Sequence, residues 1–111
     1  MASNTRDLAG FLKALSDPTR LQLVQLLAER EFVAERADEC GTGPLCVNAL
    51  AHRLGLTQSA VSQHLRILRH VGLVRGTRKG AFVHYSLDRA SLSRSLKRLQ
   101  DSLRADGSRE L

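Results

Sequence analysis

The sequence has few cysteines and no long hydrophobic run. Only two cysteines occur among its 111 residues, and the first ten residues, MASNTRDLAG, lack the apolar core of a signal peptide. Two thiols without a secretory signal argue against a disulfide framework, because cytosolic thiols are kept reduced. No apolar stretch approaches the roughly 18 to 20 residues that a transmembrane helix needs. These absences predict a cytoplasmic protein.

Residue patterns typical of common catalytic sites are also missing. The sequence shows no Ser/His/Asp ordering, no glycine-rich phosphate loop and no paired carboxylates in a predicted cleft. A chain of 111 residues is expected to form one domain with a single core, which leaves little chain for an elaborate pocket. We therefore expect no enzymatic activity.

Positive charge is concentrated in the second half of the chain. The net charge is +6, but residues 52–98 contain ten basic residues and one acid, whereas residues 1–51 contain five basic and seven acidic residues. A localised excess of cations is the electrostatic pattern of a nucleic-acid-binding surface. The charge distribution therefore places a candidate DNA surface after residue 52.

Residues 57–74, TQSAVSQHLRILRHVGLV, predict an amphipathic helix suited to a DNA groove. Thr57 is expected to cap its start, and Gly72 to end it. At about 100° per residue, one arc is apolar and includes His64, which we expect to be a satisfied core histidine. The other arc carries Gln, Ser and Arg, the side chains that reach base edges and phosphates, and no acid.

The segments on either side of this helix complete a recognisable motif. Residues 46–55 repeat the apolar i, i+3, i+4, i+7 spacing and end at Gly55, which predicts a helix-turn-helix. Residues 74–87 alternate with a period of two, which predicts a hairpin with its turn at Lys79-Gly80. The predicted fold is a mainly α winged helix-turn-helix, in the order α-α-α-α-β-β-α. Base contacts are assigned to Gln58, Ser59, Ser62 and Gln63, and phosphate contacts to Arg66, Arg69, Arg75, Arg78 and Lys79.

Three further helices are predicted outside the motif. One covers residues 5–15, a second runs from Pro18 to about Arg30 after an Asp17 cap, and the last covers residues 88–104 after an Asp88 cap. We expect residues 1–15 and 88–104 to pair across a two-fold axis and to place two recognition helices on a palindromic site. The alternative is that the last helix packs only on its own core. The predicted interface residues are Leu8, Phe11, Leu12, Leu15, Leu92, Leu96, Leu99 and Leu103.

Two long runs carry a resemblance to a known family. LSDPTRLQLVQLL and LCVNALAHRLGLTQSAVSQHLRILRHVGLVRGTRKGAFVHYSL resemble the ArsR/SmtB family of small dimeric winged-helix repressors, which sense metals, metalloids or redox species. The resemblance covers residues 8–100 and is most specific at residues 16–20, 58–65 and 72–74. It implies a homodimeric, DNA-binding transcriptional repressor that an inducer releases from DNA. It also suggests that Thr19 and Arg20 touch a phosphate, although a capped and solvated helix end explains them equally well.

Cys40 and Cys46 flank the loop Gly41-Thr42-Gly43-Pro44 and allow three interpretations. They bind a soft transition-metal ion such as zinc or nickel, they form a redox-sensitive dithiol, or they are structurally incidental. Family members with a thiolate site show Leu-Cys-Val-Cys-Asp-Leu, where this chain has Asn48 at the second cysteine. Members with a site on the last helix show Asp-x-His, where this chain has Ala90. None of the four histidines is assigned to a metal.

One alternative function remains open at this stage. A winged helix can serve as a protein-interaction module, or as a regulator subunit that needs a partner protein for sensing. DNA binding to a promoter distinguishes the two functions.

Overall fold

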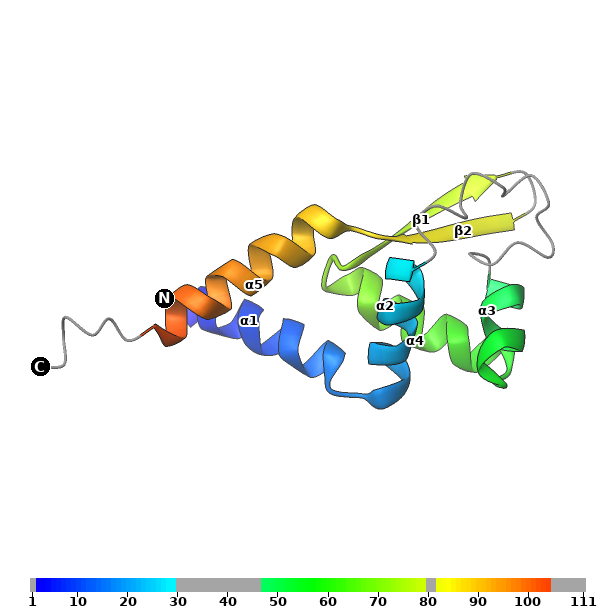
Figure 1. Ribbon diagram of the computed structural model, residues 1–111, viewed down its shortest axis with the longest axis horizontal. Coiled ribbons are helices and arrows are strands. Elements are labelled where there is room, and N and C mark those ends of the chain that lie inside the picture. The colour runs from blue at the N-terminus through cyan, green and yellow to red at the C-terminus, as the bar shows by residue number, and fades with distance from the viewer. Residues whose placement is uncertain (1, 30–46, 80–81, 105–111) are drawn as a thin grey trace, which may run out of the picture.

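The computed structural model describes residues 2–29, 47–79 and 82–104. Its helices and strands follow the predicted order, with a two-stranded antiparallel hairpin between the fourth and fifth helices (Figure 1). Among the described residues, no helix combines the length and the apolar character that crossing a membrane requires. The elements are α1 (Ala2–Leu15), α2 (Pro18–Glu29), α3 (Val47–Leu54), α4 (Gln58–His70), β1 (Val74–Lys79), β2 (Phe82–Leu87) and α5 (Arg89–Leu103).

Polar side chains cap three of the helices where the sequence predicts them. Asp17 Oδ1 accepts hydrogen bonds from the backbone N–H groups of Thr19 (2.8 Å) and Arg20 (3.1 Å) at the start of α2. Thr57 Oγ1 accepts from the Ala60 N–H at 3.0 Å, and Asp88 Oδ1 from the Ser91 N–H at 3.0 Å. Each cap satisfies an N–H group that has no partner within its own helix.

Glycine ends both helices of the helix-turn-helix in the same way. Gly55 has φ of +68° and Gly72 has φ of +81°, a left-handed conformation that favours glycine. After α4, the Leu73 N–H donates to Leu68 O (3.0 Å) and the Gly72 N–H to Arg69 O (2.9 Å), which is a Schellman motif. The same two bonds recur after α3, where the N–H groups of Leu56 and Gly55 are the donors.

The core lies where α2, α3, α4 and the base of the hairpin meet. Leu23 and Leu27 of α2, Leu50 of α3 and the α4 residues Val61, Leu65 and Leu68 are almost completely buried. Leu56 packs against the same cluster immediately before α4, together with Val61, as a hydrophobic staple requires. Ile67 departs from the predicted apolar arc, because it is 37% exposed.

The hairpin differs from the prediction at its turn. Lys79 is the last residue of β1 and pairs with Phe82, so the strands are joined by residues 80–81 rather than by Lys79-Gly80. At the base of the hairpin, the adjacent residues His84 and Tyr85 are both buried, although they point to opposite faces. Strand β2 packs against α2 and α3, and β1 packs against α4, so helices surround this part of the hairpin.

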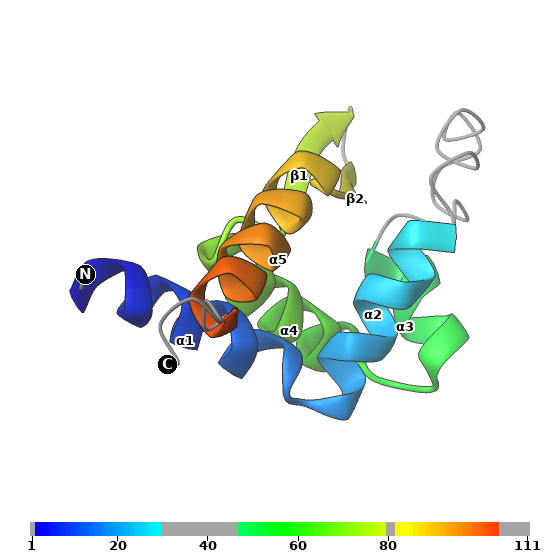
Figure 2. The same ribbon diagram turned by 60° about the vertical axis from the view of Figure 1, so that its left-hand side comes forward.

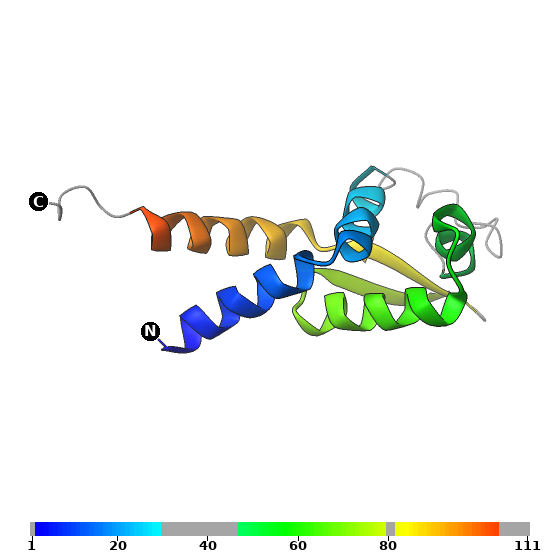
Figure 3. The same cartoon turned by 90° about the horizontal axis from the view of Figure 1, so that it is seen from below.

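The first and last helices lie together at one end of the molecule. The beginning of α1 and the end of α5 are both found there, far from α3 and the tip of the hairpin (Figures 1 and 3). Leu8 and Phe11 of α1 are buried within the protomer itself, whereas Leu12 is 44% exposed. No described side chain of α5 is fully buried.

Candidate DNA-binding surface

The outward face of α4 carries the side chains to which the sequence assigns base contacts. Gln58, Ser59 and Gln63 are exposed, Ser62 is half-buried, and no acid lies anywhere on the helix. The opposite face supplies Val61, Leu65 and Leu68 to the core. Packing therefore fixes the rotation of α4, and this rotation turns the polar arc toward solvent. Figure 2 shows the course of α4 among the other helices.

Gln58 is held by a residue that the sequence did not single out for DNA binding. Its Nε2 donates a hydrogen bond of 2.8 Å to Asn48 Oδ1, which joins the first residue of α4 to the second residue of α3. Both side chains are exposed. The bond fixes the direction of the Gln58 amide, and it leaves the Gln58 carbonyl oxygen available to a donor. Asn48 therefore joins the candidate site as a positioning residue.

The five predicted phosphate-contacting cations fall into two groups. Arg66 and Arg78 are exposed and make no hydrogen bond or ion pair with a described residue. Arg69 and Arg75 are exposed but have partners: Cζ of Arg69 lies 5.9 Å from the centroid of the Tyr85 ring, and Nε of Arg75 lies 3.3 Å from Asp88 Oδ2. The Lys79 side chain is outside the described residues. Arg66 and Arg78 are thus the cations most available to phosphate.

Asp88 connects the basic hairpin to the start of α5. Its carboxylate accepts from the Ser91 N–H and pairs with Arg75, and its own backbone N–H donates to Leu73 O at 2.8 Å. The Ser91 N–H, followed by Arg75 and the more distant Arg94, lowers the pKa of Asp88 below its usual value of 3.8. The charged carboxylate thus ties β1 to α5, and the backbone N–H of Asp88 adds a bond to the residue that follows the turn after α4.

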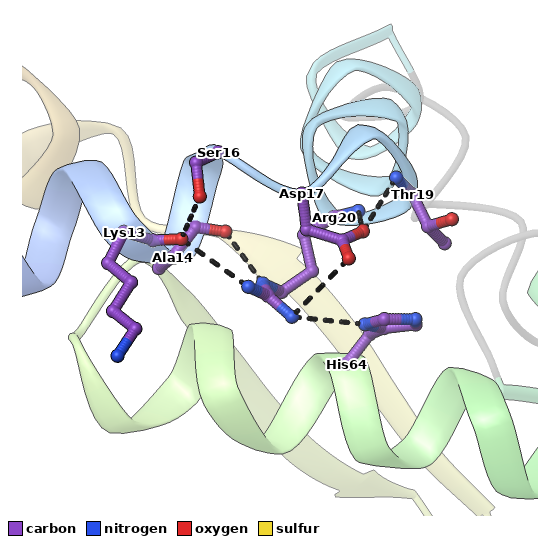
Figure 4. Close-up of polar contacts among 7 residues, drawn as sticks. All are labelled: Lys13, Ala14, Ser16, Asp17, Thr19, Arg20 and His64. Carbon is purple, nitrogen blue, oxygen red and sulfur yellow. Dashed lines mark hydrogen bonds and ion pairs between the residues drawn. The ribbon is translucent and has the colours of Figure 1, made fainter.

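Arg20 lies inside a polar cluster rather than at a solvated helix end (Figure 4). Its side chain is only 13% exposed, and Nε and Nη2 donate to the carbonyl oxygens of Ala14 (2.7 Å) and Lys13 (3.3 Å) at the end of α1. Nη1 lies 3.4 Å from Nδ1 of half-buried His64. These contacts use the guanidinium group within the protein, so the phosphate contact suggested for Arg20 is not supported.

The predicted sensing residues lie outside the described part of the chain. Cys40 and Cys46 both belong to residues 30–46. Within the described residues, no three His, Cys, Asp or Glu side chains gather as a metal site requires. The side chains of His52 and His70 are exposed. The His84 side chain is buried and interacts with a partner within the protein.

The predicted dimer residues divide between the core and the surface. Besides Leu8 and Phe11, Leu15 and Leu92 pack against the core. Leu96 is 49% exposed and Leu103 is 72% exposed, and with half-buried Leu99 they line an open apolar groove along α5. The last two turns of α5 therefore present leucines that the protomer does not cover.

Comparison with known proteins gives matches across most of the chain. Residues 40–75 match the family model described as "Bacterial regulatory protein, arsR family". A transcriptional regulator of the helix-turn-helix type from Bacillus subtilis, YbzH, is 36% identical over 84 residues, which cover 74% of this chain and 84% of the relative. The arsenical resistance operon repressor of Escherichia coli is 38% identical over 77 residues, which cover 69% of this chain and 56% of the relative.

Solved structures agree with these matches. HlyU from Vibrio cholerae is 30% identical, with a TM-score of 0.63 over 93% of this chain and 98% of the HlyU chain. Several other curated relatives are longer, and the matched part spans 49% to 66% of their length.

Proposed function

The chain belongs to the ArsR family of bacterial regulatory proteins, and on this premise we propose that it is a homodimeric repressor that binds a palindromic operator. Transcriptional regulators of this kind are not enzymes. The observation that carries the proposal is the outward face of α4, which has no acid and lies next to a basic hairpin. The family match favours DNA binding over the alternative of a protein-interaction module.

The chemistry of the exposed face suggests a division of labour on DNA. We assign base contacts to Gln58, Ser59, Ser62 and Gln63, because amide and hydroxyl groups distinguish base edges in the major groove. The arginines are assigned to phosphates, which supply affinity and orientation but carry no sequence information. Arg66 and Arg78 lead this group, and Arg69, Arg75 and Lys79 support them from α4 and the hairpin.

The dimer is inferred from the uncovered leucines of the terminal helices. Leu96 and Leu103 leave a large apolar surface in water, and burying such surface gains about 25 cal/mol per Å². A two-fold axis that joins these helices would present two copies of α4 to successive major grooves, about 34 Å apart. Among the predicted interface residues, Leu12, Leu96 and Leu103 are exposed, and half-buried Leu99 lies beside the last two in the groove.

DNA affinity measured at several salt concentrations tests the proposal. We expect the full chain to bind the promoter of its own operon more tightly than a scrambled duplex, and affinity to fall as salt rises. Arg66→Gln removes one phosphate contact per protomer and hence two per bound dimer, so it should lower the slope of log K against log salt by about 1.8. Lys97→Gln, at an exposed position of α5 outside the leucine groove, is the matched control and should leave the slope unchanged. Absence of any salt-dependent binding would refute DNA binding.

We also propose that a metal ion or a thiol-reactive compound acts as the inducer. The support is the name of the E. coli relative, which refers to arsenical resistance, together with two cysteines in residues 30–46. Thiolates of Cys40 and Cys46 would supply soft ligands to a metal ion, or would oxidise together. Promoter binding is measured with Zn²⁺, Ni²⁺, arsenite or diamide, using Cys40→Ser and Cys46→Ser. If neither substitution alters release from DNA, these thiols are not the sensor.

A further inference from the structure

A cavity of about 430 Å³ lies between α1, α5 and the end of α4. We infer that it binds a small organic anion that has an apolar body, such as an aryl phosphate or an aromatic carboxylate. The volume falls within the range of about 300 to 1,000 Å³ that is usual for small-molecule sites. None of the residues assigned to DNA contacts lines the cavity.

Three guanidinium groups surround the cavity. Arg94 and Arg98 are one turn apart on α5, and Arg6 lies on α1. All three side chains are exposed, and none forms an ion pair with a described residue. Asp7 is the one acidic residue in the lining, so the cavity carries an excess of positive charge. Arginines without carboxylate partners keep their donors available, and these donors match phosphate and carboxylate oxygens in pairs.

The remaining lining supplies both hydroxyl groups and apolar surface. Ser91 and Ser95 are half-buried on α5, one turn apart, on the same face as the two arginines. Leu8 and Phe11 of α1 are buried beneath the cavity, and Val71 closes it at the end of α4. An inorganic anion would interact with the arginines and the hydroxyl groups but would leave this apolar surface exposed to water. The lining therefore favours an anion attached to an apolar group.

The cavity and the leucine groove occupy different faces of α5. At about 100° per residue, the line through Ser91, Ser95 and Arg98 lies roughly 120° from the line through Leu96 and Leu103. A partner protomer seated on the leucines would therefore leave the cationic face of the same helix uncovered. The inferred cavity is thus compatible with the proposed dimer.

Gly10 lines the cavity and leaves open space at this position. It lies inside α1, where glycine costs about 1 kcal/mol relative to alanine. A Cβ atom built on Gly10 would meet nothing within 4 Å among the described residues, so packing in the protomer does not require glycine. Gly10 lines the cavity, and its missing side chain leaves room for a bound molecule.

Occupancy of the cavity should influence DNA binding, a consequence that depends on the proposed function. His70 is the last residue of α4, Val71 follows it, and both line the cavity opposite α5. A ligand that contacts these residues and the arginines of α5 would favour one relative position of the two helices. It can change DNA affinity only to the extent that it binds the DNA-competent arrangement differently from the other.

Calorimetric titration of the full chain with phenyl phosphate tests the inference without DNA. We expect one saturable site per chain, and affinities for inorganic phosphate and for phenol that are each at least about tenfold weaker, a difference of 1.4 kcal/mol. Arg94→Gln/Arg98→Gln should weaken phenyl phosphate binding by about tenfold or more. Gly10→Leu should do the same by filling the cavity, with its folding checked by thermal unfolding.

The matched control is Arg53→Gln/Lys97→Gln, which removes the same charge at two exposed positions outside the cavity lining. Its affinity for phenyl phosphate should stay within about twofold of the wild type. No binding by the wild type, or equal weakening in both double variants, would overturn the inference. If the wild type did not bind the promoter, the proposed function would be refuted. The calorimetric result would still decide whether the cavity binds anions.

Discussion

Nη1 of Arg20 and Nδ1 of His64 lie 3.4 Å apart, which joins the start of α2 to the middle of α4 (Figure 4). A guanidinium group can only donate, so Nδ1 accepts and the proton of a neutral His64 ring is on Nε2. The same guanidinium holds two carbonyl oxygens at the end of α1. One side chain therefore connects the first helix of the chain to the proposed DNA-binding helix.

Removing this connection should destabilise the fold. Arg20→Ala leaves the carbonyl oxygens of Lys13 and Ala14 without these donors, and we expect a loss of about 1 to 3 kcal/mol in the free energy of unfolding. Urea denaturation measures the change. Arg53→Ala, at an exposed position on α3, is the control and should change stability by no more than about 0.5 kcal/mol. Equal losses in the two variants would contradict the role of Arg20.

Glycine-to-alanine substitutions should have opposite effects at different positions. Gly55→Ala and Gly72→Ala force an alanine to adopt a positive φ, which costs about 1 to 2 kcal/mol. Steric clash contributes little, because the nearest atom to an added Cβ at Gly72 is Ser91 Oγ at 3.5 Å, and nothing lies within 4 Å at Gly55. Gly10→Ala, inside a helix, should stabilise by about 0.5 to 1 kcal/mol. Thermal unfolding of all three variants measures these effects. If Gly10→Ala shifted the melting temperature in the same direction as Gly55→Ala and Gly72→Ala, the explanation would be wrong.

The lowered pKa of Asp88 predicts a pH-dependent contribution to stability. A carboxyl group whose pKa is lowered on folding stabilises the protein above its unfolded pKa, and the contribution disappears as pH falls through the folded pKa. Asp88→Asn keeps a capping side chain but removes the charge. We expect the variant to unfold more easily than the wild type at pH 7, and the difference to vanish as pH falls below about 4.

The control for this titration is Asp101→Asn. Asp101 pairs with Lys97 at 3.7 Å, but the two side chains are 54% and 76% exposed, and pairs of this kind contribute little. A pH profile of Asp88→Asn that runs parallel to the wild type down to pH 2 would argue against a charged cap.

Charge placed on the leucine groove should dissociate the dimer. Leu96→Glu/Leu103→Glu introduces two carboxylates per chain into the proposed interface, where burial of an unpaired charge is costly. We expect sedimentation to show monomers at concentrations where the wild type is dimeric. Ala90→Glu adds a carboxylate to the first turn of α5, away from the leucines and at an electrostatically favourable helix start, so it should remain dimeric. A wild-type monomer would refute the dimer.

Base and phosphate contacts should separate in DNA-binding measurements. Arg78→Ala should weaken binding to promoter and random DNA alike and reduce the salt slope, because phosphates are sequence-independent. Gln63→Ala should mainly change sequence preference, with a loss of about 1 to 3 kcal/mol for the preferred base pair. Asn48→Ala should behave like a weaker form of Gln58→Ala, since Asn48 acts only by orienting that amide. Identical profiles for Arg78→Ala and Gln63→Ala would contradict the assignment.

The sequence predicts the features of this fold that depend on local chemistry. Thr57, Asp17 and Asp88 cap their helices as expected, because a cap needs only a side-chain oxygen and N–H groups two or three residues away. The glycines after α3 and α4 could be predicted for the same reason, because the positive φ at each position disfavours most other residues. The turn of the hairpin was misplaced by one residue because Lys79 continues the ladder through its pair with Phe82.

Contacts between elements could not be read from the sequence. The bonds from Gln58 to Asn48 and from Arg20 to the end of α1 depend on how helices are arranged, and periodicity does not determine this arrangement. Arg69 and Arg75 look like free cations in the sequence, and only the fold shows their partners Tyr85 and Asp88. The cationic cavity likewise combines α1 and α5, which are more than 70 residues apart in the chain.

The hydrogen bond from the Asp88 N–H to Leu73 O has a mechanical consequence. It joins the start of α5 to the residue that follows the turn after α4, so a tilt of α5 would pivot near that point. Fifteen residues at 1.5 Å each make α5 a lever of about 22 Å, and a tilt of about 10° moves its far end by roughly 4 Å. A small rotation beside the proposed recognition helix in one subunit would therefore become a displacement of several ångströms at the proposed dimer interface.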